Sequence, residues 1–268
     1  MLSLWKLIKL LFRVIFLGRT HRKKMEQFRS GMGKQKAIAA VLEAYRAGDY
    51  ETALRATDPL KKIDEVSYYF FHGSMLNQIG RTQEAEKELR KCTALRQGEQ
   101  LAALAYSSHG QVLVELERCE EALKCFETSR QCDPNRGGAD RDTAHAWLIR
   151  GKPEQALNWA KSALEKERAS TGDKESRELN LRESLATLAW AVASTRGDRE
   201  EVDRLAAEAI PPPETRAPSS CAEVHIHLGK AYAALGDSAK SEWHFEEAAR
   251  IDPKGLWGRA ARSLVAAR

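Results

Sequence analysis

The sequence predicts an all-α protein, a solenoid of about six stacked helix pairs, and three observations support this prediction. The composition suits helices, because 43% of the 268 residues are hydrophobic, 7% are aromatic and only eight are prolines. Small residues, turn glycines and closing prolines recur in phase along the chain. No segment alternates apolar and polar side chains with the period of two that a half-buried strand requires.

The repeated unit has the spacing of an antiparallel helix pair. Phe245 and Pro253 stand sixteen and twenty-four residues after Gly229, and the same intervals after Gly110 lead to Phe126 and Pro134. A small residue in each helix of a pair, such as Gly110 and Ala122, lets the two helices approach closely. A glycine then ends the first helix in the left-handed conformation, at Gly48, Gly80, Gly151, Gly197 and Gly236.

Aligned on these positions, the units begin near Lys34, Val66, Ala103, Gly137, Glu183 and Ala222, with steps of 32, 37, 34, 46 and 39 residues. From residue 34 to 255 the sequence resembles the tetratricopeptide repeat family, whose repeat is 34 residues long. The resemblance implies a right-handed α-solenoid. It is strongest in the third and sixth units and weakest in the fifth, where Trp190 replaces a small residue and puts close helix packing in doubt.

Two stretches interrupt the regular spacing within the predicted repeat domain of residues 34–255. The polar run at 170–176, in the irregular region 170–182, indicates a loop or an extended second helix, and the prolines at 211–213 indicate a stiff linker within 210–221. Residues 256–268 carry an apolar face and are predicted to form the capping helix that a solenoid end requires.

The resemblance also implies a function, because repeats of this family bind an extended peptide or a helix of a partner protein in the concave groove of the solenoid. Nine residues are projected into that groove: Phe70, Ser74, Asn77, Gln78, Ser107, Gln111, Arg141, His145 and Lys230. The family variant that clamps a peptide carboxylate needs lysines that do not accompany Asn77 here, so that ligand is not predicted. The run of four aromatics at 68–71 cannot all face inward, which predicts that at least one lies on a surface.

No pattern of a catalytic, metal or cofactor site stands out, so the chain is predicted not to be an enzyme and to need no cofactor. The five cysteines show no CxxC spacing and are expected to be buried small hydrophobes rather than metal or redox groups. His225 and His227 are two residues apart, which sends their rings to different faces of a helix. Phosphate-cradling, hydrolase and metalloprotease motifs are missing from the sequence.

The N-terminal residues and the remainder of the chain differ in the sign of their net charge. Residues 1–36 hold ten Lys and Arg against Glu26 alone, a net +9, whereas the other 232 residues hold 33 basic and 37 acidic residues, a net −4. A basic stripe on the folded body, typical of nucleic-acid binding, is therefore not expected. In residues 1–18 the cations Lys6, Lys9 and Arg13 share one narrow helical sector, and a basic linker of residues 19–33 follows.

The first 18 residues are expected to contact an anionic membrane as an interfacial amphipathic helix. A short spanning anchor, a targeting peptide and a helix packed on the solenoid are the alternatives. The predicted membrane contacts are Trp5, Leu7, Leu11, Phe12, Ile15, Phe16, Arg22, Lys23 and Lys24. The function predicted from the sequence is a scaffold tethered to the cytoplasmic side of a membrane; a soluble scaffold whose N-terminal helix docks on a partner comes second, and an enzyme a distant third.

Overall fold

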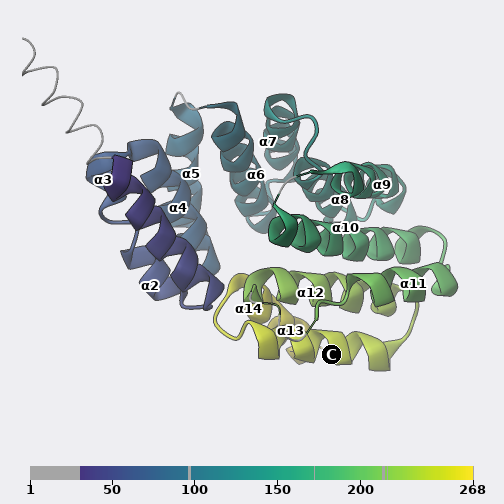
Figure 1. The fold of residues 1–268 in the computed structure, drawn as a ribbon. Coiled ribbons are helices and arrows are strands. Elements are labelled where there is room, and N and C mark those ends of the chain that lie inside the picture. Colours follow the sequence, from purple (N-terminus) through teal and green to yellow (C-terminus); the bar gives the residue numbers. More distant parts are fainter. Residues whose placement is uncertain (1–30, 96–97, 172, 213–214, 216, 268) are drawn as a thin grey trace, which may run out of the picture.

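The computed structural model describes residues 31–95, 98–171, 173–212, 215 and 217–267, and this part of the chain consists of helices and their connections, without a strand (Figure 1). Residues 31–46 form the first helix, which pairs with α2 (Tyr50–Arg55) and is followed by the short α3 (Leu60–Ile63). The later pairs are α4 (Glu65–Gln78) with α5 (Thr82–Ala94), α6 (Glu99–Glu115) with α7 (Cys119–Cys132), α8 (Gly138–Ile149) with α9 (Pro153–Ala169), α10 (Lys174–Thr195) with α11 (Arg199–Ala209), and α12 (Pro218–Ala234) with α13 (Ser238–Ile251). The all-α prediction of six helix pairs is confirmed, and α14 (Leu256–Ala266) begins where the capping helix was expected.

The turns inside the pairs have the backbone that the sequence predicts. The five turn glycines, Gly48, Gly80, Gly151, Gly197 and Gly236, all have a positive φ, between 64° and 85°. In the third pair Glu117 takes this place with a φ of 60°, a conformation that disfavours residues with a Cβ. The second helix then begins at an aspartate in several pairs; Asp198 and Asp237 each accept a hydrogen bond from a backbone N–H three residues later.

Small residues in the first helices let the paired helices touch. A Cβ at Gly110 would stand 2.3 Å from Cε1 of Phe126, and a Cβ at Gly229 would stand 2.5 Å from the same atom of Phe245. Both phenylalanines are almost fully buried, at 1% and 2% exposure. The absence of a side chain at each glycine therefore creates the space that the aromatic ring of the second helix fills.

In the fifth pair the additional residues extend the first helix, α10, at its start, and do not lengthen the preceding α9. The polar run at 170–176 does not extend the second helix α9, which ends at Ala169; instead Asp173 caps α10 by accepting a hydrogen bond from the N–H of Ser176. α10 is therefore a long first helix of 22 residues. The doubt about helix packing at Trp190 is also resolved, because Trp190 is buried and its ring lies 5.5 Å from that of His227 and 5.9 Å from that of His145.

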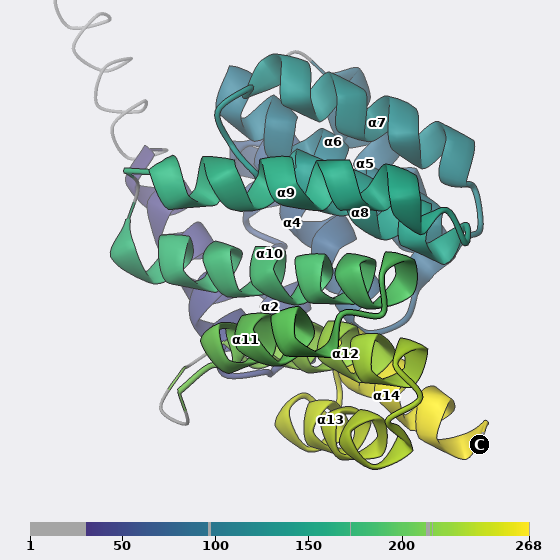
Figure 2. The same cartoon turned by 90° about the vertical axis from the view of Figure 1, so that its right-hand side faces the viewer.

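The helix pairs stack in layers, so that each hairpin packs against the next one along the chain. Figure 2 shows α9, α10 and α12 in successive layers, and the largest cluster of buried side chains joins residues of α8, α9, α10, α11 and α12. Smaller clusters lie between the helix of residues 31–46 and α4, and between α12, α13 and α14. The core is thus a series of five clusters distributed along the solenoid.

The two ends of the solenoid meet, which the sequence did not predict. The hydroxyl of Tyr50 donates a buried 2.8 Å hydrogen bond to Oδ1 of Asp252, 202 residues later in the chain. Gln78 contacts Ser219 at 3.2 Å, and its backbone carbonyl accepts a 2.5 Å hydrogen bond from the guanidinium of Arg259 in α14. The capping helix α14 therefore joins the last unit to the second one and closes the solenoid into a ring.

Candidate functional site

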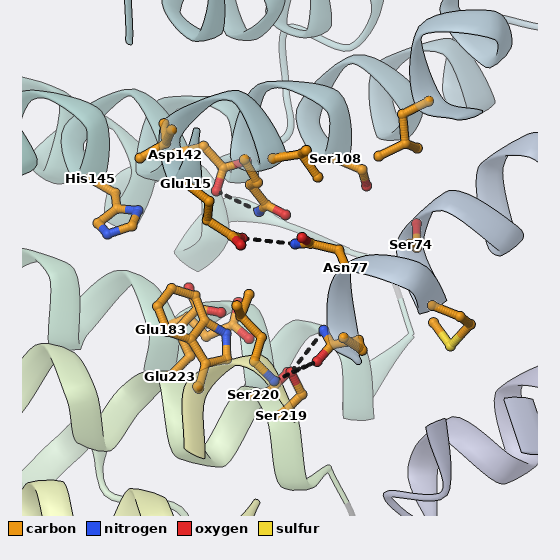
Figure 3. A pocket seen from close by; sticks show the side chains of 18 of the residues that line it. Ser74, Asn77, Ser108, Glu115, Asp142, His145, Glu183, Ser219, Ser220 and Glu223 are labelled. Carbon is orange, nitrogen blue, oxygen red and sulfur yellow. Dashed lines mark hydrogen bonds between the residues drawn. The ribbon is translucent and has the colours of Figure 1, made fainter. Parts of the chain in front are cut away.

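The ring encloses a central chamber, a pocket of about 490 Å³ lined by the helix of residues 31–46 and by α4, α6, α8, α10, α12 and α14 (Figure 3). Apart from α14, and from Leu89 of α5 at its edge, these are the first helices of the six pairs. The volume lies within the range of about 300–1,000 Å³ that is typical of ligand pockets. The first helices of the pairs therefore line one shared pocket on the concave side of the solenoid.

The structure gathers most of the residues projected into the groove. Eight of the nine line the central chamber: Phe70, Ser74, Asn77, Gln78, Gln111, Arg141, His145 and Lys230. Ser107 does not, because its hydroxyl turns toward Asp142 between α6 and α8, and it borders a smaller neighbouring cavity. Its neighbour Ser108 lines the chamber in its place. Of the aromatic run, Phe70 and Phe71 are half-buried and reach the chamber, whereas Tyr68 is buried.

Polar contacts link each of these helices to the next around the ring. From α4 to α6, Asn77 Nδ2 donates to Oε1 of Glu115 at 2.8 Å, a contact drawn in Figure 3. From α6 to α8, Gln111 donates to Asp142 at 3.0 Å. The series continues with the ion pair of Arg141 with Glu183, the contact of Thr187 with His227, the contact of Trp257 with Glu223, and the contact of Gln78 with Ser219. These links fix the relative positions of the walls.

Four acidic side chains line the chamber: Glu115, Asp142, Glu183 and Glu223. Burial raises the pKa of Glu115 to about 7, although its hydrogen bond from Asn77 acts in the opposite direction. Burial, and next to it the negative charge of Glu183, raise the pKa of Glu223 well above its usual 4.5. Desolvation thus disfavours the ionised form of both carboxyl groups, and it outweighs the opposing charges of Arg259 on Glu115 and of Arg141 on Glu223.

The basic groups of the chamber are already engaged. Arg141, only 8% exposed, forms an ion pair with Glu183 and lies 3.6 Å from Asp142. The ammonium of Lys230 lies 4.3 Å from the ring centre of Trp190, and burial lowers the pKa of Lys230 to about 8. Burial likewise lowers the pKa of His145 to about 3, so this imidazole is neutral at physiological pH.

Apolar side chains form the remainder of the chamber wall. Leu42 and Ile149 are among the few large hydrophobic side chains of the described residues that stay exposed, at 38% and 46%. Both line the chamber, together with Phe70, Leu256 and Trp257. Exposed apolar side chains in a concave site with a few convergent polar groups are typical of a binding surface.

Sequence reasoning missed the acidic residues and the whole contribution of α14. Glu115 is four residues after Gln111 and so lies on the same face of α6, which could have revealed it. Trp257 and Leu256 could not be found in this way, because their place in the chamber depends on the closure of the ring. That closure joins residues about 180 positions apart, such as Gln78 and Arg259, and carries no local sequence signal.

The histidines and cysteines do not form a reactive centre in the described part of the chain. As predicted, His225 and His227 point apart: His225 contacts His244 of α13 at 3.0 Å, whereas His227 contacts Thr187 of α10. Burial raises the pKa of Cys92 to about 12 and that of Cys221 to about 11, which disfavours a reactive thiolate at either position. Among the described residues no cluster of three or more His, Cys, Asp or Glu side chains is arranged to hold a metal ion.

The predicted membrane contacts, from Trp5 to Lys24, and with them the domain of residues 1–18 and most of the linker 19–33, lie outside the described residues. Within residues 31–267, apart from the short gaps named above, no helix is long and apolar enough to cross a membrane.

Paired helices stacked in this way define an α-solenoid repeat protein, and the sequence identifies the kind of repeat. The family model described as "Tetratricopeptide repeat" matches residues 66–98 and 222–254. These segments cover α4 with α5 and α12 with α13. Two of the six helix pairs therefore match the tetratricopeptide repeat. A search of the curated proteins found no match.

Three solved structures that are similar to this chain are MamA, BtubC and YrrB. The MamA protein is 16% identical, with a TM-score of 0.46 over 67% of this chain and 91% of its own. BtubC from P. vanneervenii is 18% identical, with a TM-score of 0.49 over 84% of this chain and 91% of its own. YrrB, described as a tetratricopeptide repeat protein with an unusual peptide-binding site, is 19% identical, with a TM-score of 0.41 over 77% and 97%.

Proposed function

We propose that this chain is a non-enzymatic scaffold that holds a segment of a partner protein in its central chamber and is tethered to the cytoplasmic side of a membrane. The observation that carries the first part is the lining of the chamber. Half-buried aromatic and exposed aliphatic side chains lie there beside polar atoms, such as Asn77 Oδ1 and His145 Nε2, that have no hydrogen-bond partner among the described residues.

Three features of the chamber favour a protein segment as its occupant. Its walls come from every helix pair, so one ligand contacts the whole ring. The mixture of apolar surface and fixed hydrogen-bonding groups suits a peptide, which presents both kinds of surface. The polar links between the walls hold the site in shape before binding, which reduces the ordering cost of a complex.

Site-specific photo-crosslinking tests the chamber as the binding site. A photoreactive amino acid at Ile149, which lines the chamber, should capture a discrete partner, whereas the same group at Gln155 on the outer face of α9 should not. Ser74→Phe, which adds a ring inside the chamber, should reduce the crosslink at Ile149. Equal capture from both positions, or capture that Ser74→Phe leaves unchanged, would contradict the proposal.

The membrane tether is supported by the sequence of residues 1–18 and by the basic linker that follows. Flotation of the full-length chain with liposomes, compared with a chain that starts at Lys34, measures this attachment. Substitution of Arg22, Lys23 and Lys24 by Gln should weaken binding to anionic vesicles and have little effect on neutral ones. The three positive charges attract only the anionic headgroups, so their loss removes only this electrostatic part of the binding. If neither chain floats with the liposomes, the result would favour the soluble scaffold whose N-terminal helix docks on a partner.

A further inference from the structure

Two carboxylates of the central chamber lack a cationic partner. Among the described residues neither Glu115 nor Glu223 forms an ion pair, whereas Glu183 and Asp142 share Arg141. Glu115 accepts one hydrogen bond, from Asn77, and Glu223 accepts one from the indole of Trp257. Figure 3 shows Glu115 on one side of the chamber and Glu223 on the other, with the open space of the pocket between them.

The other cations of the ring make their direct contacts elsewhere, although the charge of Arg259 favours the ionised form of Glu115 and that of Arg141 favours the ionised form of Glu223. Lys230 lies over the face of Trp190, and the guanidinium of Arg259 donates to the backbone carbonyls of Asn77 and Gln78. With Arg141 committed to Glu183, the lining holds four acids against two bases. Glu115 is accessible and Glu223 is half-buried, so both can offer acceptor oxygens and negative charge to a ligand that brings the opposite charge.

A second, independent observation comes from the amide of Asn77. This side chain is only 7% exposed and lines the chamber, yet its Oδ1 accepts no hydrogen bond among the described residues. Its Nδ2 is occupied by Glu115, so the unused group is an acceptor beside a carboxylate. Asn77 Oδ1 and the Glu115 carboxylate can each accept a hydrogen bond, and one positively charged donor can bind both of them.

The size of the chamber limits what can carry that charge. A helix with its side chains is about 10–12 Å across, so 490 Å³ corresponds to about one helical turn. The wall beside the carboxylates is apolar, with Phe70, Ile149 and Trp257. An occupant of about four residues that combines a cation with large apolar side chains matches this surface.

From these observations we propose that the chamber selects partner segments in which a lysine or arginine side chain is flanked by large apolar residues, and that the cation lies between Glu115 and Glu223. This inference rests on the proposed function and names the chemistry of the partner. The cation forms charge-assisted hydrogen bonds with the carboxylates and Asn77, and the apolar neighbours contact the wall.

A display selection with random heptapeptides on the immobilised full-length chain tests the inference. Peptides with Lys or Arg between large apolar residues should be enriched, and replacement of that cation by norleucine should weaken binding about 10- to 100-fold in calorimetry, the range expected for hydrogen bonds between charged groups. The double variant Glu115→Gln/Glu223→Gln should lose this preference. The matched control Glu154→Gln/Glu165→Gln, two exposed acids of α9, should retain it.

The outcomes separate this inference from the proposed function. Enriched peptides without a cation, or a cation preference that survives in the double variant, would overturn the inference and leave peptide binding intact. The failure of every peptide to bind would count against both. Preferential binding of a peptide of residues 2–17 at the same carboxylates would overturn the assignment to a partner, since the occupant would then be the chain's own basic segment. Circular dichroism checks that each variant is folded, and Glu115→Gln alone serves if the double variant is not.

Discussion

Gly110 offers the sharpest test of how the helix pairs are held together. It lies in the middle of α6, and the ring of Phe126 in α7 occupies the space where a side chain would stand. An added Cβ would be 2.3 Å from Cε1, 2.7 Å from Cδ1 and 2.8 Å from Cζ of that ring. Carbon atoms pack best at about 3.5–4.0 Å, so the ring or the helix must move by about 1 Å.

Two opposing effects determine the stability of Gly110→Ala. Alanine is favoured over glycine in a helix interior by about 1 kcal/mol. Overpacking costs about 1–3 kcal/mol, and the upper value applies here because Phe126 is 1% exposed and cannot swing into solvent. The net loss in the free energy of unfolding is therefore about 2 kcal/mol, which lowers the melting temperature by about 4–8 °C in a chain of this size.

Thermal and urea denaturation followed by circular dichroism measure this change. Gly138→Ala is the matched control, because its Cβ would find only Arg136 Nε at 3.5 Å, an ordinary contact, near the start of α8. This control should be neutral or stabilising by up to about 1 kcal/mol. Gly110→Leu should be more destabilising than Gly110→Ala. A Gly110→Ala protein that melts at or above the wild-type temperature would show that the pairs are not close-packed at this position.

Three further substitutions test the turn, the buried ion pairs and the charge of the chamber. Glu117→Gly should raise the free energy of unfolding by about 0.5–1 kcal/mol in urea denaturation, because it removes a left-handed residue with a Cβ. Arg141→Ala should lower it by about 3–5 kcal/mol, since Glu183 and Asp142 stay buried without a cation; a loss below about 1 kcal/mol would contradict this. The raised pKa of Glu223 means that the folded state holds this proton more tightly than the unfolded state, so the wild type loses stability as pH rises from the usual 4.5 through the raised value. Glu223→Gln should thus gain in melting temperature over the wild type as pH rises above the usual 4.5, and a gain that does not grow with pH would refute the assignment.

The repeat architecture could be predicted because its determinants are local. A turn glycine with positive φ and a small residue seven positions before it fix the geometry of one hairpin, as Gly229 and Gly236 do in the sixth pair. At least one of these two signals is present in each pair, although Glu117 replaces the turn glycine of the third pair and Trp190 the small residue of the fifth. The chamber residues followed from the same phase, since side chains four residues apart, such as Ser74 and Gln78, lie on the same face of one helix.

The prediction failed where a single residue or a long-range contact decides the outcome. Ser107 and Ser108 are adjacent, so a helix turns them about 100° apart, and phase alone could not tell which one faces the chamber. The length of α10 was not predicted, because the polar residues 170–176 have the composition of a loop, although Asp173 caps a helix there. Ring closure depends on Arg259 of α14 reaching the carbonyl of Gln78, and no period within the chain encodes that distance.

Closure of the ring also links binding to the integrity of the solenoid. In an open array the end units have one neighbour each, whereas here Tyr50 and Asp252 join the first pair to the last. The proposed ligand contacts Glu115 on one side of this joint and Glu223 on the other, so it adds a connection across the same joint. Binding and closure then stabilise each other by an equal free energy, because the coupling of two equilibria is reciprocal. A chamber that keeps unpaired carboxylates gives up some stability when empty and recovers it when a cation enters.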